Sequence, residues 1–183
     1  MELNILDWFQ TLHTPILDKI MTSITKLGDA GIFWIILTLL FLIIPKMRKT
    51  GIIMAAALIM DLLICNVAVK NLVARTRPYD VNTSVQLLVA KLHDYSFPSG
   101  HTAASFASVT ALYLAGEKKL WKPALVLACL IAVSRLYLYV HYPTDVLGGM
   151  VFGILAGFAV YLIVKLLETK LSGRKYAVNQ IRR

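Results

Sequence analysis

Hydrophobic residues along the chain gather into five long segments that are separated by short polar stretches. These segments cover residues 30–45, 51–69, 97–116, 123–140 and 146–164. At a rise of about 1.5 Å per residue, helices of these lengths measure roughly 24–30 Å, close to the thickness of the hydrocarbon core of a bilayer. Apolar and polar residues do not alternate as they do in the strands of a membrane barrel. The pattern therefore predicts an all-α bundle with five transmembrane helices.

The N-terminal segment has a different pattern, because its hydrophobic positions recur at roughly helical spacing with charged residues between them. Thr14 is suited to cap a helix and Pro15 to begin one, which predicts two short amphipathic helices. A sixth, marginal span is the alternative, at the cost of charged residues inside the membrane. We expect one domain made of an interfacial segment, a transmembrane bundle and a basic cytoplasmic tail, at residues 1–29, 30–167 and 168–183.

The composition agrees with a membrane protein of one domain. Of the 183 residues, 58% are hydrophobic and 16% are charged, whereas soluble domains average about half and about a quarter. Intrinsic disorder and a secreted disulfide scaffold are excluded. The excess of 19 Lys and Arg over 10 Asp and Glu would suggest a nucleic-acid partner in a soluble protein. We expect no such partner, because the cations form no basic run interleaved with aromatic residues.

The cations predict the orientation of the chain in the membrane. If the five spans alternate in direction, twelve of the 19 cations fall on one side, and the positive-inside rule makes that side cytoplasmic. These twelve are Lys46, Arg48, Lys49, Lys118, Lys119, Lys122, Lys165, Lys170, Arg174, Lys175, Arg182 and Arg183. The opposite, extracytoplasmic face of the plasma membrane then holds five cations that need another explanation, namely Lys70, Arg75, Arg77, Lys91 and Arg135.

The first polar cluster on the extracytoplasmic side ends the second span. Lys70 and Arg77 are seven residues apart, a spacing that places both on one face of a helix after two turns. Two aligned cations can hold a doubly charged anion, Arg through two parallel hydrogen bonds and Lys as a point charge. The alternative is that both are anchors whose side chains reach the membrane surface.

The second cluster begins the third span with the sequence Pro98-Ser99-Gly100-His101. Pro98 and Ser99 suit the start of a helix, and Gly100 lets a ligand approach the backbone closely. A helix N-terminus directs free N–H groups and a positive dipole at an anion, with the Ser99 hydroxyl as a further donor. His101 is then placed to donate a proton, although a histidine at such a turn is also typical of a cap or a surface.

The third cluster lies between the fourth and fifth spans and contains Arg135, His141 and Asp145. Arg135 can complete an anion site. His141 can attack phosphorus through one ring nitrogen while Asp145 holds the N–H of the other. A pair with this spacing can also be a surface ion pair or a helix cap. Taken together, the three clusters predict phosphoryl transfer through a phosphohistidine, without a metal.

The clusters resemble the three-part signature of the type 2 phosphatidic acid phosphatase superfamily. The signature is complete and in order over residues 70–145: Lys70-x6-Arg77-Pro78, Pro98-Ser99-Gly100-His101 and Ser134-Arg135-x5-His141-x3-Asp145. The resemblance implies a six-helix membrane phosphatase that acts on lipid phosphates or polyprenyl diphosphates without a cofactor. It makes His141 the nucleophile, Asp145 its orienting partner and His101 the general acid. The phosphate-binding residues that it implies are Lys70, Arg77, Ser99, Gly100 and Arg135.

The sequence leaves the substrate open. The small size and the outward-facing predicted site resemble bacterial enzymes that act on undecaprenyl diphosphate or phosphatidylglycerophosphate; we favour the first of these over the second and over phosphatidate. Because only five spans are clear, the resemblance makes the N-terminal segment the first helix of the family. A lipid phosphotransferase and a non-catalytic lipid-phosphate binder or transporter are the other readings, and the presence of both His101 and His141 argues against the last.

Two further patterns carry expectations about packing and solvent. Gly149, Gly153 and Gly157 repeat every four residues, which predicts a close-packing surface, either inside the bundle or between the protomers of an oligomer. His93 and Asp94 lie in the long polar segment before the third span, and we expect them to form a solvated pair in a loop.

Overall fold

The computed structural model describes residues 1–181 and the side chains of residues 1–171, and all regular elements in this part are helices. The predicted all-α class is confirmed. The α-helices are α1 (Glu2–Gln10), α2 (Pro15–Gly28), α3 (Ile32–Ile43), α4 (Arg48–Asp61), α5 (Lys70–Val73), α6 (Pro78–Val81), α7 (Gly100–Leu114), α8 (Trp121–Tyr137) and α9 (Pro143–Ile181). Two 3₁₀ turns and one π-helix connect them, at η1 (Asp29–Gly31), η2 (Pro45–Met47) and η3 (Leu62–Val69).

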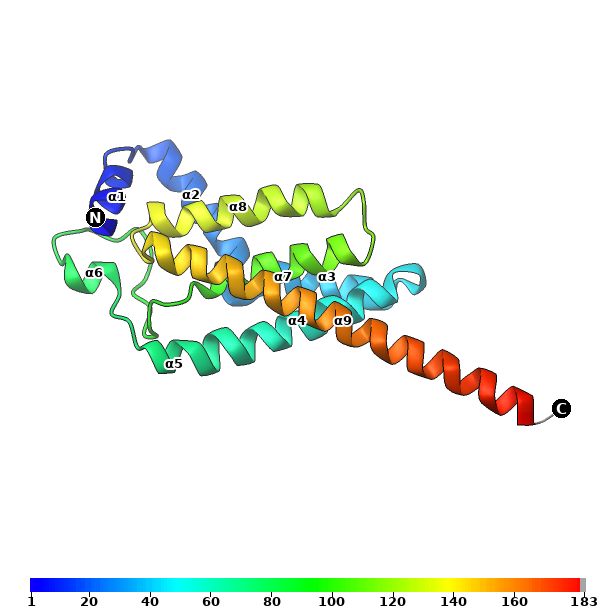
Figure 1. Ribbon diagram of the computed structural model, residues 1–183. Coiled ribbons are helices and arrows are strands. Elements are labelled where there is room, and N and C mark those ends of the chain that lie inside the picture. The colour runs from blue at the N-terminus through cyan, green and yellow to red at the C-terminus, as the bar shows by residue number, and fades with distance from the viewer. Residues whose placement is uncertain (182–183) are drawn as a thin grey trace.

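The long helices run side by side as a bundle, with α4, η3 and α5 forming one continuous helical rod (Figure 1). Three segments are long and apolar enough to cross a membrane: Pro15–Ile43, Pro45–Val81 and Pro143–Leu171. Large apolar side chains such as Ile36, Leu63 and Leu155 are exposed on these helices, as expected for a surface in contact with lipid. Helices α7 and α8 have 15 and 17 residues, and the count of five spans stays a prediction.

The N-terminal segment enters the bundle. As predicted, the Thr14 hydroxyl accepts a hydrogen bond from the backbone N–H of Leu17 at 3.2 Å, and Pro15 is the first residue of α2. Helix α2 then continues through the kink at η1 into α3, so that Pro15–Ile43 forms one candidate span. The predicted boundary at residue 29, and the predicted start of the first span at residue 30, therefore fall inside one helical segment. Only α1 precedes it.

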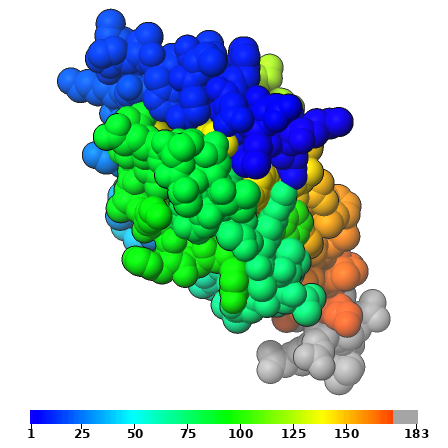
Figure 2. Space-filling model, turned by 90° about the vertical axis from the view of Figure 1, so that its left-hand side faces the viewer, coloured from blue at the N-terminus to red at the C-terminus, as the bar shows by residue number. Residues whose placement is uncertain are grey.

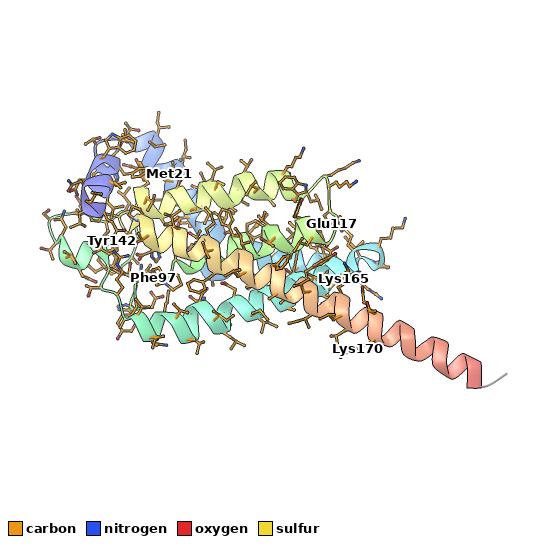
Figure 3. All side chains as sticks on the ribbon, in the orientation of Figure 1. Met21, Phe97, Glu117, Tyr142, Lys165 and Lys170 are labelled. Atoms are coloured by element: carbon orange, nitrogen blue, oxygen red, sulfur yellow. The ribbon has the colours of Figure 1, made fainter. Side chains whose placement is uncertain are left out.

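The connections between the helices lie at two opposite ends of the bundle. The α3–α4 connection and the α7–α8 loop lie at one end, where Glu117 and Lys165 are also found (Figures 1 and 3). Helices α1 and α6 lie at the opposite end, together with Phe97 and Tyr142. The start of α7, the end of α8 and the start of α9 meet at this second end, so all three polar clusters are brought together there.

The glycine repeat lies inside the bundle. Gly149, Gly153 and Gly157 are buried against α7. A Cβ atom would come within 2.5 Å of the Ser99 carbonyl oxygen at the first position and within 2.9 Å of the Ala107 carbonyl oxygen at the third. Of the two predicted uses of this face, packing inside the bundle is confirmed, because α7 occupies it.

Candidate active site

The turn between α8 and α9 places His141 at the centre of the site, with only 1% of its surface exposed. Its Nδ1 atom lies 3.6 Å from Oδ2 of Asp145, and its Nε2 atom lies 3.4 Å from Nη1 of Arg77. One ring nitrogen therefore faces a carboxylate and the other faces a cation. Carboxylate contacts of this kind are often long before substrate binds, and the arrangement presents Nε2 to an anion held by Arg77.

Asp145 is held rigidly at the start of α9. Its Oδ1 atom accepts a hydrogen bond from Nη1 of Arg75 at 2.6 Å, and its Oδ2 atom accepts from the backbone N–H of Tyr142 at 2.8 Å and from the hydroxyl of Ser96. The side chain is fully buried. These donors fix the carboxylate opposite His141, which is the role that the signature implies for it.

Burial lowers the pKa of His141 to about 3; the nearby charges of Arg77 and Arg135 also lower it, and they oppose the hydrogen bond and charge of Asp145. A pKa this far below the ordinary value of about 6.5 keeps the imidazole neutral near pH 7. The neutral ring has a free lone pair, which a nucleophile requires.

Lys70 and Arg77 converge on one anion, although not in the way that their spacing suggests. The helix stops at Val73, Ala74 adopts a left-handed conformation with φ of 48°, and the chain runs extended to Arg77. The prediction that two turns of one helix align these cations is therefore wrong. Both are instead oriented by the loop carboxylate of Asp94, which accepts a hydrogen bond from Nζ of Lys70 and another from Nη2 of Arg77 at 2.6 Å.

Asp94 thus bridges the two cations that the sequence predicts to bind a phosphate. Burial raises the pKa of its carboxyl group, but hydrogen bonds and charges from Lys70 and Arg77 outweigh this effect and lower the pKa to about 2. The carboxylate is thus ionised at all physiological pH values. The expectation that Asp94 forms a solvated pair with His93 is wrong. The segment that carries it covers this end of the molecule, next to α1 and α2 (Figure 2).

Helix α7 begins where the second cluster predicts. The Ser99 hydroxyl caps it by accepting a hydrogen bond from the backbone N–H of Thr102 at 3.5 Å. At Gly100, a Cβ atom would lie 2.6 Å from the Asn66 side-chain oxygen, so glycine leaves room for this amide beside the helix start. His101 projects from the first turn of α7, and its Nε2 atom lies 2.8 Å from Oδ1 of Asp29.

A cavity of about 560 Å³ joins these groups. Five of the eight predicted site residues line it: Lys70, Arg77, Gly100, His101 and His141. Asp145 contacts His141 of this lining, and the backbone N–H of Ser99 donates a hydrogen bond to the carbonyl oxygen of Asp145. Arg135 is 2% exposed, donates a hydrogen bond to the Thr25 hydroxyl and keeps a buried Nε atom without a partner among the described residues. Within residues 1–171, no group of three or more His, Cys, Asp or Glu side chains is arranged to hold a metal ion.

Comparison with known proteins decides the family. The model of the PAP2 superfamily matches residues 50–168. The chain is 33% identical to an undecaprenyl-diphosphatase from Sulfolobus acidocaldarius over 137 residues. The aligned region covers 75% of this chain and 66% of that protein. It is 32% identical over 160 residues to the undecaprenyl-diphosphatase BcrC of Bacillus subtilis, covering 85% of this chain and 79% of that protein. The chain belongs to the PAP2 superfamily.

A solved PAP2 structure has the same fold. The transmembrane PAP2-type phosphatidylglycerolphosphate phosphatase from Bacillus subtilis superimposes with a TM-score of 0.71 at 30% identity, over 88% of this chain and 83% of that one. The PAP2 match encloses all eight predicted site residues. The protein is therefore a multi-pass membrane enzyme of a phosphatase superfamily, as the sequence predicts.

Several residues of the PAP2 site were not predicted from the sequence. Asp29 and Asp94 contact signature residues from elsewhere in the chain, and neither lies in a recognisable motif. Arg75 and Ser96 hold Asp145. Arg75 lies within the first signature motif and is one of the five cations predicted on the extracytoplasmic side, whereas Ser96 lies two residues before the second motif; these are the signals in the sequence that could have found them.

Proposed function

We propose that this protein is a lipid phosphatase that hydrolyses a lipid phosphomonoester or a polyprenyl diphosphate through a phosphohistidine on His141. The observation that carries the proposal is the composition of the cavity wall. Lys70, Arg77 and both histidines line one region of the cavity, and apolar side chains line most of the remainder. These apolar residues include Ile35, Leu39, Leu42, Leu58, Ile59 and Leu62. A ligand that fits both regions has an anionic head and a hydrocarbon tail.

The proposed reaction follows from the arrangement of the two histidines. Phosphate displaces the Asp94 carboxylate and takes the donors of Lys70 and Arg77. The Nε2 atom of His141 attacks phosphorus, the bond from phosphorus to the leaving oxygen breaks, and His101 gives that oxygen a proton. Water then attacks the phosphohistidine, the N–P bond breaks, and inorganic phosphate leaves. Arg135 and the N-terminus of α7, with Ser99 and Gly100, stabilise the charge on the phosphoryl oxygens.

Undecaprenyl diphosphate is the substrate that we favour. Two relatives named as undecaprenyl-diphosphatases support this choice, whereas the solved phosphatidylglycerolphosphate phosphatase supports the alternative. We place the site at the extracytoplasmic face of the plasma membrane, with α7 and α8 as the third and fourth of five spans. The α3–α4 connection with Lys46 and the α7–α8 loop with Lys118 and Lys119 lie at the opposite end of the bundle (Figure 1), which supports this orientation.

Phosphate release from a panel of lipids tests the proposed activity. Purified protein in detergent micelles is given undecaprenyl diphosphate, phosphatidylglycerophosphate or phosphatidate, and we expect the highest kcat/KM for the first. His141→Ala should abolish turnover of every substrate, while His93→Ala, a change in an exposed loop histidine, should leave it within about twofold. Normal turnover by His141→Ala would refute the mechanism. Addition of an alcohol acceptor and product analysis distinguish a hydrolase from a phosphotransferase.

Cysteine labelling tests the proposed orientation. Lys91 and Lys118 are exposed at opposite ends of the bundle. A membrane-impermeant thiol reagent applied to intact cells should label Lys91→Cys and spare Lys118→Cys. The reverse pattern would place the site on the cytoplasmic side.

A further inference from the structure

One ring nitrogen of His101, the proposed general acid, contacts Asp29, a residue outside the family signature. Nε2 of His101 lies 2.8 Å from Oδ1 of Asp29, a distance typical of a charge-assisted hydrogen bond. Asp29 is 72 residues away in the chain, in the η1 kink between α2 and α3. With Nε2 held in this way, Nδ1 is the nitrogen of His101 that can serve the cavity.

The kink is shaped around the imidazole ring. A Cβ atom on Gly28 would lie 2.7 Å from Cδ2 of His101, so only glycine lets the end of α2 pack against this ring. The next residues, Ala30 and Gly31, both have positive φ, 49° and 67°, a costly conformation for alanine. The N-terminus of α3 has no side-chain cap. The Asp29 carboxylate is therefore directed at His101 and is not used to cap a helix.

The charges around His101 explain why a carboxylate, that of Asp29, is needed beside it. Burial and two nearby cations, Arg135 from α8 and Lys70 from α5, disfavour a protonated imidazole. Asp29 is the anion that opposes them. A general acid must begin the reaction protonated, so a site rich in cations needs a local negative charge beside its proton donor.

We propose that Asp29 is a positioning residue that holds Nε2 of His101, favours the protonated ring and aims Nδ1–H at the leaving oxygen. This inference rests on the proposed function. As the bond from phosphorus to oxygen breaks, the Nδ1 proton passes to the leaving oxygen and the ring becomes neutral, while Asp29 stays ionised and keeps its hydrogen bond to Nε2. In the second step the neutral ring takes a proton from the attacking water, which restores the starting state. The logic is that of the carboxylate in a catalytic triad, applied to an acid.

Substrates with different leaving groups test the role of Asp29. An alkyl phosphate needs a proton on its leaving oxygen, whereas p-nitrophenyl phosphate releases a stable anion without one. We expect Asp29→Asn to lower kcat about ten- to a hundredfold for the alkyl phosphate, part of the 10²–10⁴-fold contribution of general acid catalysis. The variant should keep KM within about twofold and should stay within about threefold of wild type for p-nitrophenyl phosphate. Its alkaline limit of kcat should move to lower pH.

Two controls separate this role from a structural one. Asp80→Asn removes a carboxylate that lies 3.8 Å from Lys91, away from His101, and should leave both substrates and the pH profile unchanged. Asp29→Asn should cause no further loss in a His101→Ala background, because the acid is already gone. Equal losses on both substrates, an unmoved pH profile or an additive loss in that background would overturn the proposal. Normal turnover by His141→Ala would instead refute the proposed function, so the two failures are distinguishable.

Discussion

Replacing Asp94 with asparagine should strengthen the binding of anions at the active site. The Asp94 carboxylate holds the same two cations, Lys70 and Arg77, that a substrate phosphate needs. Every anion that binds must therefore displace it. An asparagine side chain has the same shape and one acceptor oxygen, but no charge, so it would compete more weakly.

The size of the effect follows from the perturbed titration of this carboxyl group. Its pKa is lowered from 3.8 to about 2, and each pKa unit corresponds to about 1.36 kcal/mol, which sets an upper limit of about 2.5 kcal/mol. The side chain is 51% exposed, and solvent screening reduces the interaction to about 1 kcal/mol. A difference of this size is about fivefold in a dissociation constant.

The assay is inhibition of lipid hydrolysis by orthovanadate or inorganic phosphate at pH 7 and low ionic strength. We expect the inhibition constant of Asp94→Asn to be about fivefold lower than that of wild type, and the difference to shrink at high salt. Asp80→Asn is the matched control, since it neutralises another aspartate of the same end without touching Lys70 or Arg77. An unchanged or higher inhibition constant for Asp94→Asn would refute competition and would mean that Asp94 preorganises the cations.

Three more predictions concern stability and the support of the nucleophile. Because the folded pKa of His141 is about 3 and the unfolded value about 6.5, the unfolded state binds more protons between these values, and His141 should cost up to about 1.4 kcal/mol of stability per unit of acidification there. Lowering the pH from 7 to 4.5 should therefore reduce the Tm of wild type more than that of His141→Asn. Equal decreases in the Tm of the two proteins would contradict this. Gly153→Leu should prevent close packing on the Ala103 carbonyl and cost about 3 kcal/mol or more, seen as a lower Tm, whereas Leu at the exposed Ile154 should be nearly neutral. Arg75→Gln should release one carboxylate oxygen of Asp145 and lower kcat about tenfold with little change in KM; a change in KM alone would assign Arg75 to substrate binding.

Much of the site could be predicted because its chemistry lies in short, local patterns. His141 and Asp145 are close in sequence, and a turn followed by a helix start brings them together with few alternatives. The start of α7 was equally clear, because Pro98 and Ser99 fit the first positions of a helix. In both cases the predicted site residues also determine the local backbone.

The contacts that sequence reasoning missed depend on chain segments that are distant or unusual. Lys70 and Arg77 meet because the helix breaks at Ala74, and alanine gives no sign of a left-handed conformation. Asp94 was expected to be solvated, since its two partners lie 24 and 17 residues away across that break. The continuation of α2 into α3 was hidden for the same reason, because the kink at Asp29 resembles a boundary when it is read as sequence.

The glycine contacts between α7 and α9 separate the tightly packed side of the active site from the side formed by other helices. His101 lies on α7 and Asp145 on α9. At Gly149, Gly153 and Gly157 the backbone of α9 packs directly against α7, because glycine has no side chain to separate the two helices. His101 and Asp145 therefore stand on two helices in direct backbone contact, and we expect their relative positions to persist through each catalytic cycle. Another wall of the cavity is formed by α3 and α4, and we expect any widening that admits a lipid to take place there, away from His101 and Asp145.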